Sequence, residues 1–546
     1  MRSTMQDVPL SIGSVLRYAS TAYGTSTVST WTGEGSRKIT YADVGRRCAQ
    51  LANALRRLGI TGDQRVATFQ WNNTEHLEVY LAAPAMGAVL HTLNIRLFPE
   101  QLIYVANHGE DQVVVVDNTL VPLLARVLPK LETVRHVLVV GPADLSPLEG
   151  AGKELHSYDD LLAAEPDVFD WPSIDERQAA AMCYTSGTTG NPKGVVYSHR
   201  SAVLHSMSVC MGDLLGLSDR DRVLPVVPMF HANAWGLPYA AVMVGASLTM
   251  PDRFLQAEPL ARLIETEKPT VAGAVPTIWN DLLDYSRKAG SDLTSLRVVA
   301  CGGAAVPQAL MEGFEQDLGV TIMQAWGMTE TSPVASVARA PHDVAPDDEM
   351  RYRITQGRLL GGVEGRLVGP GDSFLPHDGK AVGELEVRGP WVTGSYYSGD
   401  DGTVVDADRF HDGWLRTGDV GSLTPDLFFA ISDRSKDVIK SGGEWISSVE
   451  LENQLMGHPA VLEASVVGVP DDKWGERPLA CVVLRKGESG GPEEFREFLA
   501  DRIAWWQVPE RWAFIDAVPR TSVGKFDKKV LRQRYADGDL DVMSVS

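Results

Sequence analysis

The sequence predicts an α/β protein, in which a large N-terminal domain of layered, mostly parallel sheets with helices precedes a small α+β domain. From residue 38 to residue 330, strand and helix patterns alternate, which is typical of βαβ units on a parallel sheet. Beyond about residue 345, glycine and acidic residues become frequent and short alternating strands indicate a β-rich subdomain. We therefore expect an N-terminal domain at 1–432, with its β-rich subdomain at about 345–432, and a separate C-terminal domain at 433–546.

Apolar periodicity and capping residues predict the individual elements. Thr40 can cap a helix within residues 38–59, where apolar side chains recur at helical spacing and Gly59 ends the pattern. The other predicted helices lie at 75–89, 99–109, 120–131, 200–217, 235–246, 255–267, 277–290, 447–457 and 492–504. The predicted strands lie at 65–73, 89–95, 112–117, 134–141, 179–184, 194–199, 221–230, 247–251, 270–276, 296–304, 320–330, 357–369, 383–389, 427–434, 462–470, 479–485 and 510–516.

The bulk composition excludes several classes of protein. A chain of 546 residues exceeds one hydrophobic core, and its formal net charge of −21 argues against nucleic-acid binding. The five cysteines are scattered without metal-ligand spacing, so we expect neither disulfides nor structural zinc. No secretion signal is visible, and no uncharged apolar run reaches the roughly 18 residues of a membrane span. We expect a cytoplasmic enzyme without stable membrane insertion.

A glycine- and hydroxyl-rich loop within residues 184–198 joins two predicted strands. Glycines let backbone N–H groups turn toward an anion, hydroxyls donate hydrogen bonds or ligate a metal, and Lys193 adds a positive charge. The loop differs from the Walker P-loop, because Pro192 precedes the lysine and Gly194 follows it. It predicts a polyphosphate cradle, against the alternative of a polar hairpin turn.

Two further motifs follow predicted strands of the parallel sheet, at the edge where ligands bind in such sheets. Residues 324–331 offer an aromatic side chain for a flat base, a threonine for a phosphate and Glu330 for Mg²⁺. Residues 301–305 are small, which allows a ligand to approach the backbone closely. Taken alone, each is also compatible with a solvated strand end or a tight turn.

Three more motifs lie farther along the chain. In residues 414–419, Asp419 can accept a hydrogen bond from a ribose hydroxyl. Residues 433–445 are charged, contain glycine and fall at the predicted domain boundary. Residues 519–529 place Lys525 on a glycine turn. Read separately, these motifs are compatible with an ordinary linker or a solvated lysine.

In this order and spacing, the six motifs resemble those of the adenylate-forming superfamily, which includes acyl-CoA and aryl-CoA ligases, peptide-synthetase adenylation domains and firefly-type luciferases. The resemblance covers essentially the whole chain. Residues 228–239 are similar to the corresponding segment of bacterial medium- and long-chain fatty acyl-CoA synthetases and of methylmercaptopropionate-CoA ligases.

The resemblance implies two half-reactions with ATP, Mg²⁺ and CoA. A carboxylate attacks the α-phosphate of ATP to give acyl-AMP and pyrophosphate, and the CoA thiolate then displaces AMP. It assigns catalysis to Lys525, His231, Glu330 and Thr185, with Thr185 and Glu330 also near the metal. It assigns ATP or AMP binding to Thr185, Ser186, Gly187, Thr188, Thr189, Gly190, Lys193, Gly303, Ala304, Gln324, Ala325, Trp326, Thr329, Asp419, Arg434, Lys436, Lys440, Trp445 and Lys525.

The resemblance also implies a rotation of the C-terminal domain between the half-reactions. Asp433 is the implied hinge, and Lys440, Gly442 and Gly443 lie on the face that meets CoA. The implied acyl pocket contains His231, Trp235, Val227, Gly302 and Pro333, and Trp235 resembles a gate to it. Because His231 and Trp235 are four residues apart, they share a face if this segment is helical.

The identity of the acid stays open at this stage. The main expectation is a medium- or long-chain fatty acid, because glycines at 302 and 303 leave room for an alkyl chain. Methylmercaptopropionate or another short acid is the first alternative, and an aryl acid is the second. A stand-alone adenylation enzyme, a luciferase-like oxygenase and a non-catalytic nucleotide-binding protein are weaker alternatives. The resemblance to long-chain enzymes further implies a homodimer.

Overall fold

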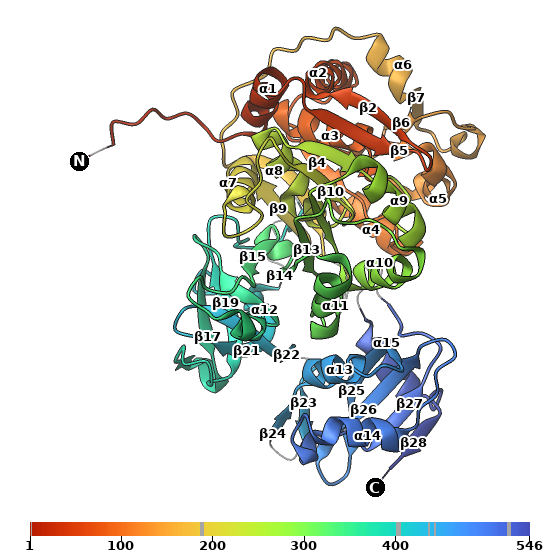
Figure 1. The fold of residues 1–546 in the computed structure, drawn as a ribbon. Coiled ribbons are helices and arrows are strands. Elements are labelled where there is room, and N and C mark those ends of the chain that lie inside the picture. Colours follow the sequence, from red (N-terminus) through yellow and green to blue (C-terminus); the bar gives the residue numbers. More distant parts are fainter. Residues whose placement is uncertain are drawn as a thin grey trace.

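The computed structural model describes residues 1, 3–185, 191–399, 406–434, 437–441, 444–520 and 526–545. The chain forms an upper body of two sheets with helices, a β-rich part beside it, and a C-terminal domain below both (Figure 1). This arrangement confirms the predicted fold class.

The first sheet has seven strands in the order β7-β6-β5-β3-β4-β8-β9, and all neighbours are parallel except β8 and β9. Its four central valines in β5 are fully buried. The strands are β3 (Arg65–Phe69), β4 (Val89–Thr92), β5 (Asp111–Asp117), β6 (His136–Val140), β7 (Glu154–Ser157), β8 (Ala179–Tyr184) and β9 (Gly194–Ser198). The helices in this part of the chain are α1 (Ile12–Ala22), α2 (Tyr41–Arg57), α3 (Thr74–Ala85), α4 (Pro99–His108), α5 (Val121–Ala125), α6 (Tyr158–Ala163), α7 (His199–Cys210) and α8 (Leu237–Val244), and α8 contacts the second sheet.

The second sheet joins the parallel part of the N-terminal domain to the β-rich part. Its strands run β18-β17-β19-β21-β22-β16-β15-β14-β13-β12-β10-β11-β1-β2, with β20 on β21. Pairing is parallel from β14 to β1 and antiparallel elsewhere. The parallel part and its edge comprise β1 (Thr27–Trp31), β2 (Ser36–Thr40), β10 (Arg222–Pro225), β11 (Ser247–Met250), β12 (Val271–Ala274), β13 (Val298–Gly302) and β14 (Ile322–Gly327), with helices α9 (Ala257–Glu267), α10 (Pro276–Ala289) and α11 (Gln308–Leu318).

The β-rich part is therefore hydrogen-bonded to the parallel strands rather than separate from them. It contains β15 (Val334–Val337), β16 (Gly357–Leu359), β17 (Glu364–Val368), β18 (Phe374–Leu375), β19 (Gly383–Arg388), β20 (Phe410–His411), β21 (Trp414–Leu423) and β22 (Phe428–Arg434), with the short helix α12 (Met350–Arg353).

The C-terminal domain has its own sheet and its own core. The sheet runs β24-β23-β26-β27-β28, with β25 on β26, and contains β23 (Ile439–Ser441), β24 (Glu444–Ile446), β25 (Val461–Asp471), β26 (Gly475–Leu484), β27 (Arg511–Phe514) and β28 (Val542–Ser544). Its helices are α13 (Ser448–Met456), α14 (Pro492–Ala500) and α15 (Lys528–Ala536). An ion pair of 3.0 Å between Arg485 and Asp284 of α10 links it to the N-terminal domain.

Several predicted elements are confirmed, and two differ for identifiable reasons. Thr40 caps α2 in a capping box with Asp43. The helix predicted at 120–131 is wrong as one element, because Pro122 and Pro129 each begin a new short helix. The helix predicted at 200–217 ends at Cys210, where the next residue is extended. His231 and Trp235 were expected to share a face only if their segment is helical; this condition is not met, because Ala232–Trp235 all have left-handed backbones with φ of 43–58°.

Other elements were not predicted, including α1, α11 and α15. Helix α11 buries Leu310, Met311 and Phe314 at helical spacing, so its pattern was present in the sequence. All five cysteines are free thiols. Among the described residues, none of the helices combines the length and apolar composition that crossing a bilayer requires.

A buried ionic contact fastens three helices of the N-terminal domain. Arg47 of α2 lies 2.6 Å from the carboxylate of Glu78 in α3, and the Tyr158 hydroxyl of α6 donates to the same carboxylate at 2.7 Å. The Glu78 side chain is fully buried. Burial raises the pKa of Glu78 to about 7, against the opposing effect of Arg47.

We predict that Glu78 makes stability fall as pH rises toward neutrality. The pKa of Glu78 is higher in the folded state than the unfolded value of 4.5. Its contribution to the free energy of unfolding is therefore fully present below pH 4.5 and is lost as pH rises through about 7. In Glu78→Gln this contribution is absent, and the stability difference between wild type and variant should shrink by about 2 kcal/mol from pH 5 to pH 8. Urea unfolding at each pH measures it. Glu100→Gln, at an exposed position in α4, is the control, and a difference that stays constant with pH would contradict the prediction.

Candidate active site

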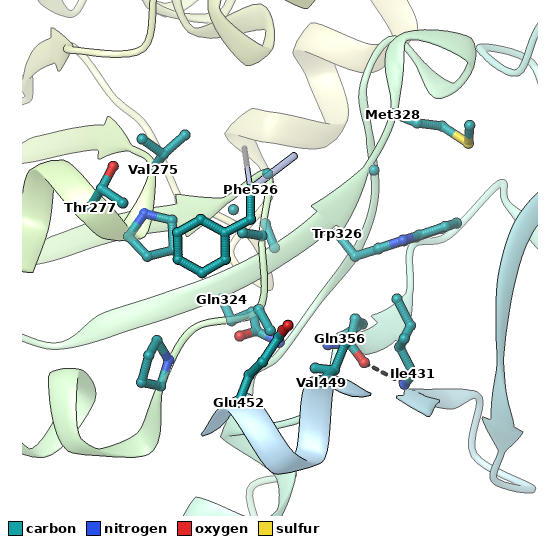
Figure 2. Close-up of a pocket in the computed structure, with 18 of the residues that line it drawn as sticks. Val275, Thr277, Gln324, Trp326, Met328, Gln356, Ile431, Val449, Glu452 and Phe526 are labelled. Carbon is teal, nitrogen blue, oxygen red and sulfur yellow. Dashed lines mark hydrogen bonds between the residues drawn. The ribbon is translucent and has the colours of Figure 1, made fainter. Parts of the chain in front are cut away.

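One cavity of about 1030 Å³ lies where the N-terminal domain, the β-rich part and the C-terminal domain meet. Figure 2 shows side chains from all three around the same space, among them Gln324 and Trp326 of β14, Ile431 of β22, and Glu452 of α13. The predicted site residues that line it are Thr185, Lys193, His231, Trp235, Gly302, Gly303, Ala304, Gln324, Ala325, Trp326, Thr329, Glu330, Pro333, Asp419 and Asp433. Arg520, Phe526 and Lys528 of the motif at 519–529 also line the cavity, so all six motifs, far apart in the sequence, share one site.

The floor of the cavity is backbone at the carboxyl ends of β13 and β14. Cys301 pairs with Gln324 and Gly302 with Ala325. A Cβ atom at Gly302 would lie 2.6 Å from the Ala325 carbonyl oxygen, and Gly303 has a φ of +83°. Glycine is therefore required at both positions, since any side chain would separate the strands or strain the turn.

Between β14 and the β-rich part, the cavity is lined by Gln324, Trp326, Gln356, Asp419 and Ile431, and we call this part of the cavity the slot. The Trp326 indole N–H donates to the Asp419 carboxylate at 2.8 Å, and Asp419 is buried. The Gln324 amide is held from both ends, because its oxygen accepts from Val306 N–H at 2.9 Å and its nitrogen donates to Thr355 at 2.6 Å. These contacts fix the side chains in a geometry that can receive a flat ring and a sugar hydroxyl.

The sequence analysis missed two residues of this slot. Gln356 lines the cavity and accepts from the Ile431 N–H at 2.5 Å, a hydrogen bond drawn in Figure 2. Both lie in the β-rich part, where no motif marked them. Only the pairing of β16 with β22 brings them beside β14.

The oxygen-rich wall of the cavity carries Thr185, Thr329 and Glu330. Tyr396 donates to the Glu330 carboxylate at 2.5 Å, and Tyr197 donates to the Thr329 carbonyl at 2.7 Å. Burial, with the adjacent Glu330, raises the pKa of Tyr396, so its hydroxyl stays protonated as a donor. One carboxylate and one hydroxyl here are the oxygen ligands that Mg²⁺ prefers.

The ends of the glycine-rich loop are held together at this wall. Thr185 N–H donates to the Lys193 carbonyl at 2.9 Å, and Lys193 N–H donates to the Thr185 hydroxyl at 3.1 Å. The Lys193 ammonium forms an ion pair with Asp406 and lies 5.1 Å from the centre of the Tyr396 ring. Asp406 is a second polar residue that the sequence analysis missed.

The wall that carries His231 and Trp235 is a left-handed turn, so the condition that this segment be helical is not met. Residues 232–236 all have positive φ, at a typical cost of about 1–2 kcal/mol for each non-glycine residue. Asn233 is buried in the turn, where its side-chain oxygen lies 3.1 Å from the Cys183 thiol. The turn lays the Trp235 indole against the places where Cβ atoms of Gly273 and Gly302 would be, 3.6 and 3.7 Å away. The close packing on these glycines compensates the backbone strain.

Asp433, the predicted hinge, is buried at the end of the cavity. Its carboxylate accepts from both the N–H and the hydroxyl of Ser448, at 2.6 and 2.5 Å. Lys528 donates to the same hydroxyl at 2.5 Å and pairs with Glu452 at 2.9 Å. Burial acts to lower the pKa of Lys528, but the carboxylates of Glu452, Asp433 and Asp437 outweigh it, and the net direction is upward.

The remaining predicted site residues are placed differently or lie outside the description. Val227 is buried behind the wall and is not a lining residue; its N–H donates to Gly273 at 2.8 Å. For Arg434, Lys440 and Trp445 only the backbone is described, with Arg434 paired to Asp419 and Lys440 to Trp445. Outside the described residues lie Ser186, Gly187, Thr188, Thr189, Gly190, Lys436, Gly442, Gly443 and Lys525.

Comparisons with known proteins identify the family of the chain. The AMP-binding enzyme family matches residues 17–397, and the AMP-binding enzyme C-terminal domain matches residues 450–525. A 3-methylmercaptopropionyl-CoA ligase of Ruegeria lacuscaerulensis is 44% identical over 98% of this chain and 99% of its own length. A medium-chain-fatty-acid–CoA ligase of Ectopseudomonas oleovorans is 42% identical over 98% of each chain. A long-chain-fatty-acid–CoA ligase of Thermus thermophilus is 44% identical over 98% of this chain and 97% of its own.

Solved structures share the whole architecture. The anthranilate CoA ligase AuaEII in complex with anthranoyl-AMP superposes with a TM-score of 0.86 at 25% identity, covering 98% of this chain and 100% of its own. ATP-bound MatB from Rhodopseudomonas palustris gives a TM-score of 0.82 at 26% identity, covering 97% and 99%. Members of this family use ATP and CoA. The chain belongs to the AMP-binding enzyme family and is, within that family, an AMP-forming acyl-CoA ligase.

Proposed function

We propose that this enzyme activates an aliphatic carboxylic acid as its acyl-AMP in the described cavity and then transfers the acyl group to CoA. The observation that carries this proposal is the convergence of the loop ends, the β13 and β14 ends, Asp419 and the C-terminal domain on one cavity. That arrangement supplies a base slot, an oxygen-rich wall and an apolar side within reach of one another.

In the first half-reaction, the nucleotide base lies in the slot beside Trp326 and its ribose binds the carboxylate of Asp419. Thr185, Lys193 and the loop between them hold the β- and γ-phosphates, and Thr329 meets the α-phosphate. Thr185 and Glu330 would hold Mg²⁺, which neutralises phosphate charge when bound. Lys525 stabilises the charge that develops on the α-phosphate oxygens as the carboxylate attacks.

In the second half-reaction, the C-terminal domain turns about Asp433 and presents the 436–445 face to the cavity. Lys440, Gly442 and Gly443 then leave a passage for the pantetheine arm of CoA, because glycine occupies little volume. The thiolate attacks the acyl carbonyl and AMP leaves. The buried bonds of Asp433 to Ser448 support a defined starting orientation. In this proposal the domain boundary lies at 432 and 433.

The acid is bound between His231 and the Trp235 indole, beside Gly302 and Pro333. The main candidate is a medium- or long-chain fatty acid whose chain passes Trp235 when the indole moves. The second candidate is a short acid such as 3-methylmercaptopropionate. One observation favours it: Trp235 is only 7% exposed and packs over Gly273 and Gly302. In this position the indole shortens the apolar part of the cavity that is available to the acyl chain.

We also propose a cytoplasmic location, where ATP and CoA are supplied, and a homodimer formed through the N-terminal domain. The dimer rests on the resemblance to long-chain synthetases, and light scattering coupled to size-exclusion chromatography tests it.

Lys525→Ala should lose adenylation and keep thioester formation. One lost cation at a developing charge typically lowers the rate by about 10²–10³-fold. ATP–pyrophosphate exchange measures the first step, and CoA consumption with synthetic acyl-AMP measures the second. Lys529→Ala, an exposed lysine in α15, is the matched control. Full exchange activity in Lys525→Ala would remove the lysine from the proposed mechanism.

Trp235→Ala should shift the preference toward longer acids. The added apolar space accommodates further methylenes, each worth about 1–3 kcal/mol in kcat/KM discrimination. The measurement is AMP release with CoA and Mg·ATP across C2 to C18 acids, methylmercaptopropionate, benzoate and cinnamate. Trp235→Phe keeps an aromatic plate and should keep the wild-type preference. An unchanged profile in Trp235→Ala would place the acyl chain elsewhere, and no thioester from any acid in the wild type would refute the ligase proposal.

Asp433→Pro should slow thioester formation more than adenylation, because proline fixes φ where the domain must turn. The variant also loses both bonds to Ser448, so Asp433→Ala, which loses the same two bonds without fixing the backbone, is the matched control. Single-turnover rates of each half-reaction separate the effects. Equal slowing of both steps in Asp433→Pro, or the same pattern in Asp433→Ala, would contradict a hinge at this residue.

A further inference from the structure

Two imidazoles and one carboxylate gather at the edge of the seven-stranded sheet, outside the cavity. His136 lies on β6, and Glu154 and His156 lie on the neighbouring edge strand β7. Glu154 and His156 share one face of β7 because they are two residues apart, and His136 is the register partner of Glu154. Figure 1 places these strands at the end of the molecule far from the C-terminal domain.

The three side chains converge on a common point. His136 Nδ1 lies 3.3 Å from Glu154 Oε2 and 3.3 Å from His156 Nε2, and the third separation, His156 Nε2 to Glu154 Oε2, is 3.9 Å. A triangle with sides of 3.3, 3.3 and 3.9 Å has a circumscribed circle with a radius of about 2.1 Å, which matches Zn–N and Zn–O bond lengths. One ion can therefore contact all three atoms without movement of the strands.

We propose that His136, Glu154 and His156 bind a transition-metal dication of the Zn²⁺ type. Two imidazole nitrogens and one carboxylate oxygen are a frequent three-residue set for zinc, with a fourth position left to water. Imidazole ligands select this class over Mg²⁺, which prefers oxygen alone. The cysteine pattern gave no sign of this site, since none of its ligands is a thiol.

Binding replaces the hydrogen bond between the two imidazoles. In the metal-free arrangement one ring donates its N–H to the other across 3.3 Å. Both nitrogens must be unprotonated to ligate the ion, so that proton passes to solvent or to the other nitrogen of its ring. Glu154 neutralises one of the two positive charges of the ion.

The physical effect is to fasten the edge of the sheet. Strand β7 has four residues, none of them buried, and it pairs with β6 on one side. A metal bound by residues of both β6 and β7 links the two strands through their side chains, in addition to the backbone hydrogen bonds of this pairing. The imidazoles are 11% and 21% exposed, which leaves them largely positioned before the ion arrives.

The test is zinc binding by the full-length enzyme, freed of metal with a chelator and dialysed against Zn²⁺ without ATP. Metal content is measured by elemental analysis, and Co²⁺ substitution reports coordination through its visible absorption. We expect one ion per chain, at least about tenfold weaker binding in His156→Gln and in Glu154→Gln, and unchanged binding in His342→Ala, an exposed histidine outside the cluster. Zn²⁺ should raise the thermal midpoint of wild type and not that of His156→Gln.

Two results would overturn the proposal. One is a wild-type enzyme that takes up no zinc at micromolar free metal, in which case the cluster is only an ion-paired histidine dyad. The other is zinc uptake that survives both His156→Gln and Glu154→Gln, which would place the ion elsewhere. Acyl-CoA ligase activity at saturating Mg·ATP is not the readout, so failure here leaves the proposed reaction intact.

Discussion

The shape of the candidate active site depends on the contact between the Asp433 carboxylate and Ser448. It joins the last residues of β22 to the first turn of α13, and both elements contribute residues to the lining of the cavity. Burial of a charge is costly unless it is fully paired. Here Ser448 supplies two donors, and the Lys528–Glu452 pair lies against the same hydroxyl. This network therefore holds the end of β22 and the start of α13 in one defined arrangement.

A second constraint is the strain in residues 232–236. Left-handed backbone persists only where the surroundings over-determine it, and such strain gathers at functional sites. Gly236 fits against His205, whose imidazole accepts from the N–H of Val334, while Trp235 covers Gly273 and Gly302. The turn, β12, β13 and the segment after β14 are thus packed as one wall. The Trp235 indole therefore packs directly on strands β12 and β13.

The sequence was sufficient wherever chemistry and periodicity are local. Thr40 with Asp43, the buried β5 valines and the small residues at 302 and 303 could all be predicted from their neighbours alone. The spacing of His231 and Trp235 could not show whether their segment is helical, because a four-residue interval in the sequence is compatible with a left-handed turn as well as with a helix. Gln356, Ile431 and Asp406 could not be found, since only long-range strand pairing and loop contacts bring them to the cavity.

The polar groups that we assign to the nucleotide already have protein partners, and this shapes the energetics of binding. Lys193 pairs with Asp406, Glu330 accepts from Tyr396, and Asp419 accepts from Trp326. In this assignment, substrate phosphates compete with Asp406 for Lys193. The contact between Lys193 and a phosphate therefore contributes to the binding free energy only the difference between the two ion pairs. The bonds to Glu330 and Asp419 need no such exchange, because a carboxylate can accept further donors or a metal while keeping its present one. We infer that Tyr396 and Trp326 orient their carboxylates for binding, whereas Asp406 holds Lys193 near the loop until a stronger anion takes its place.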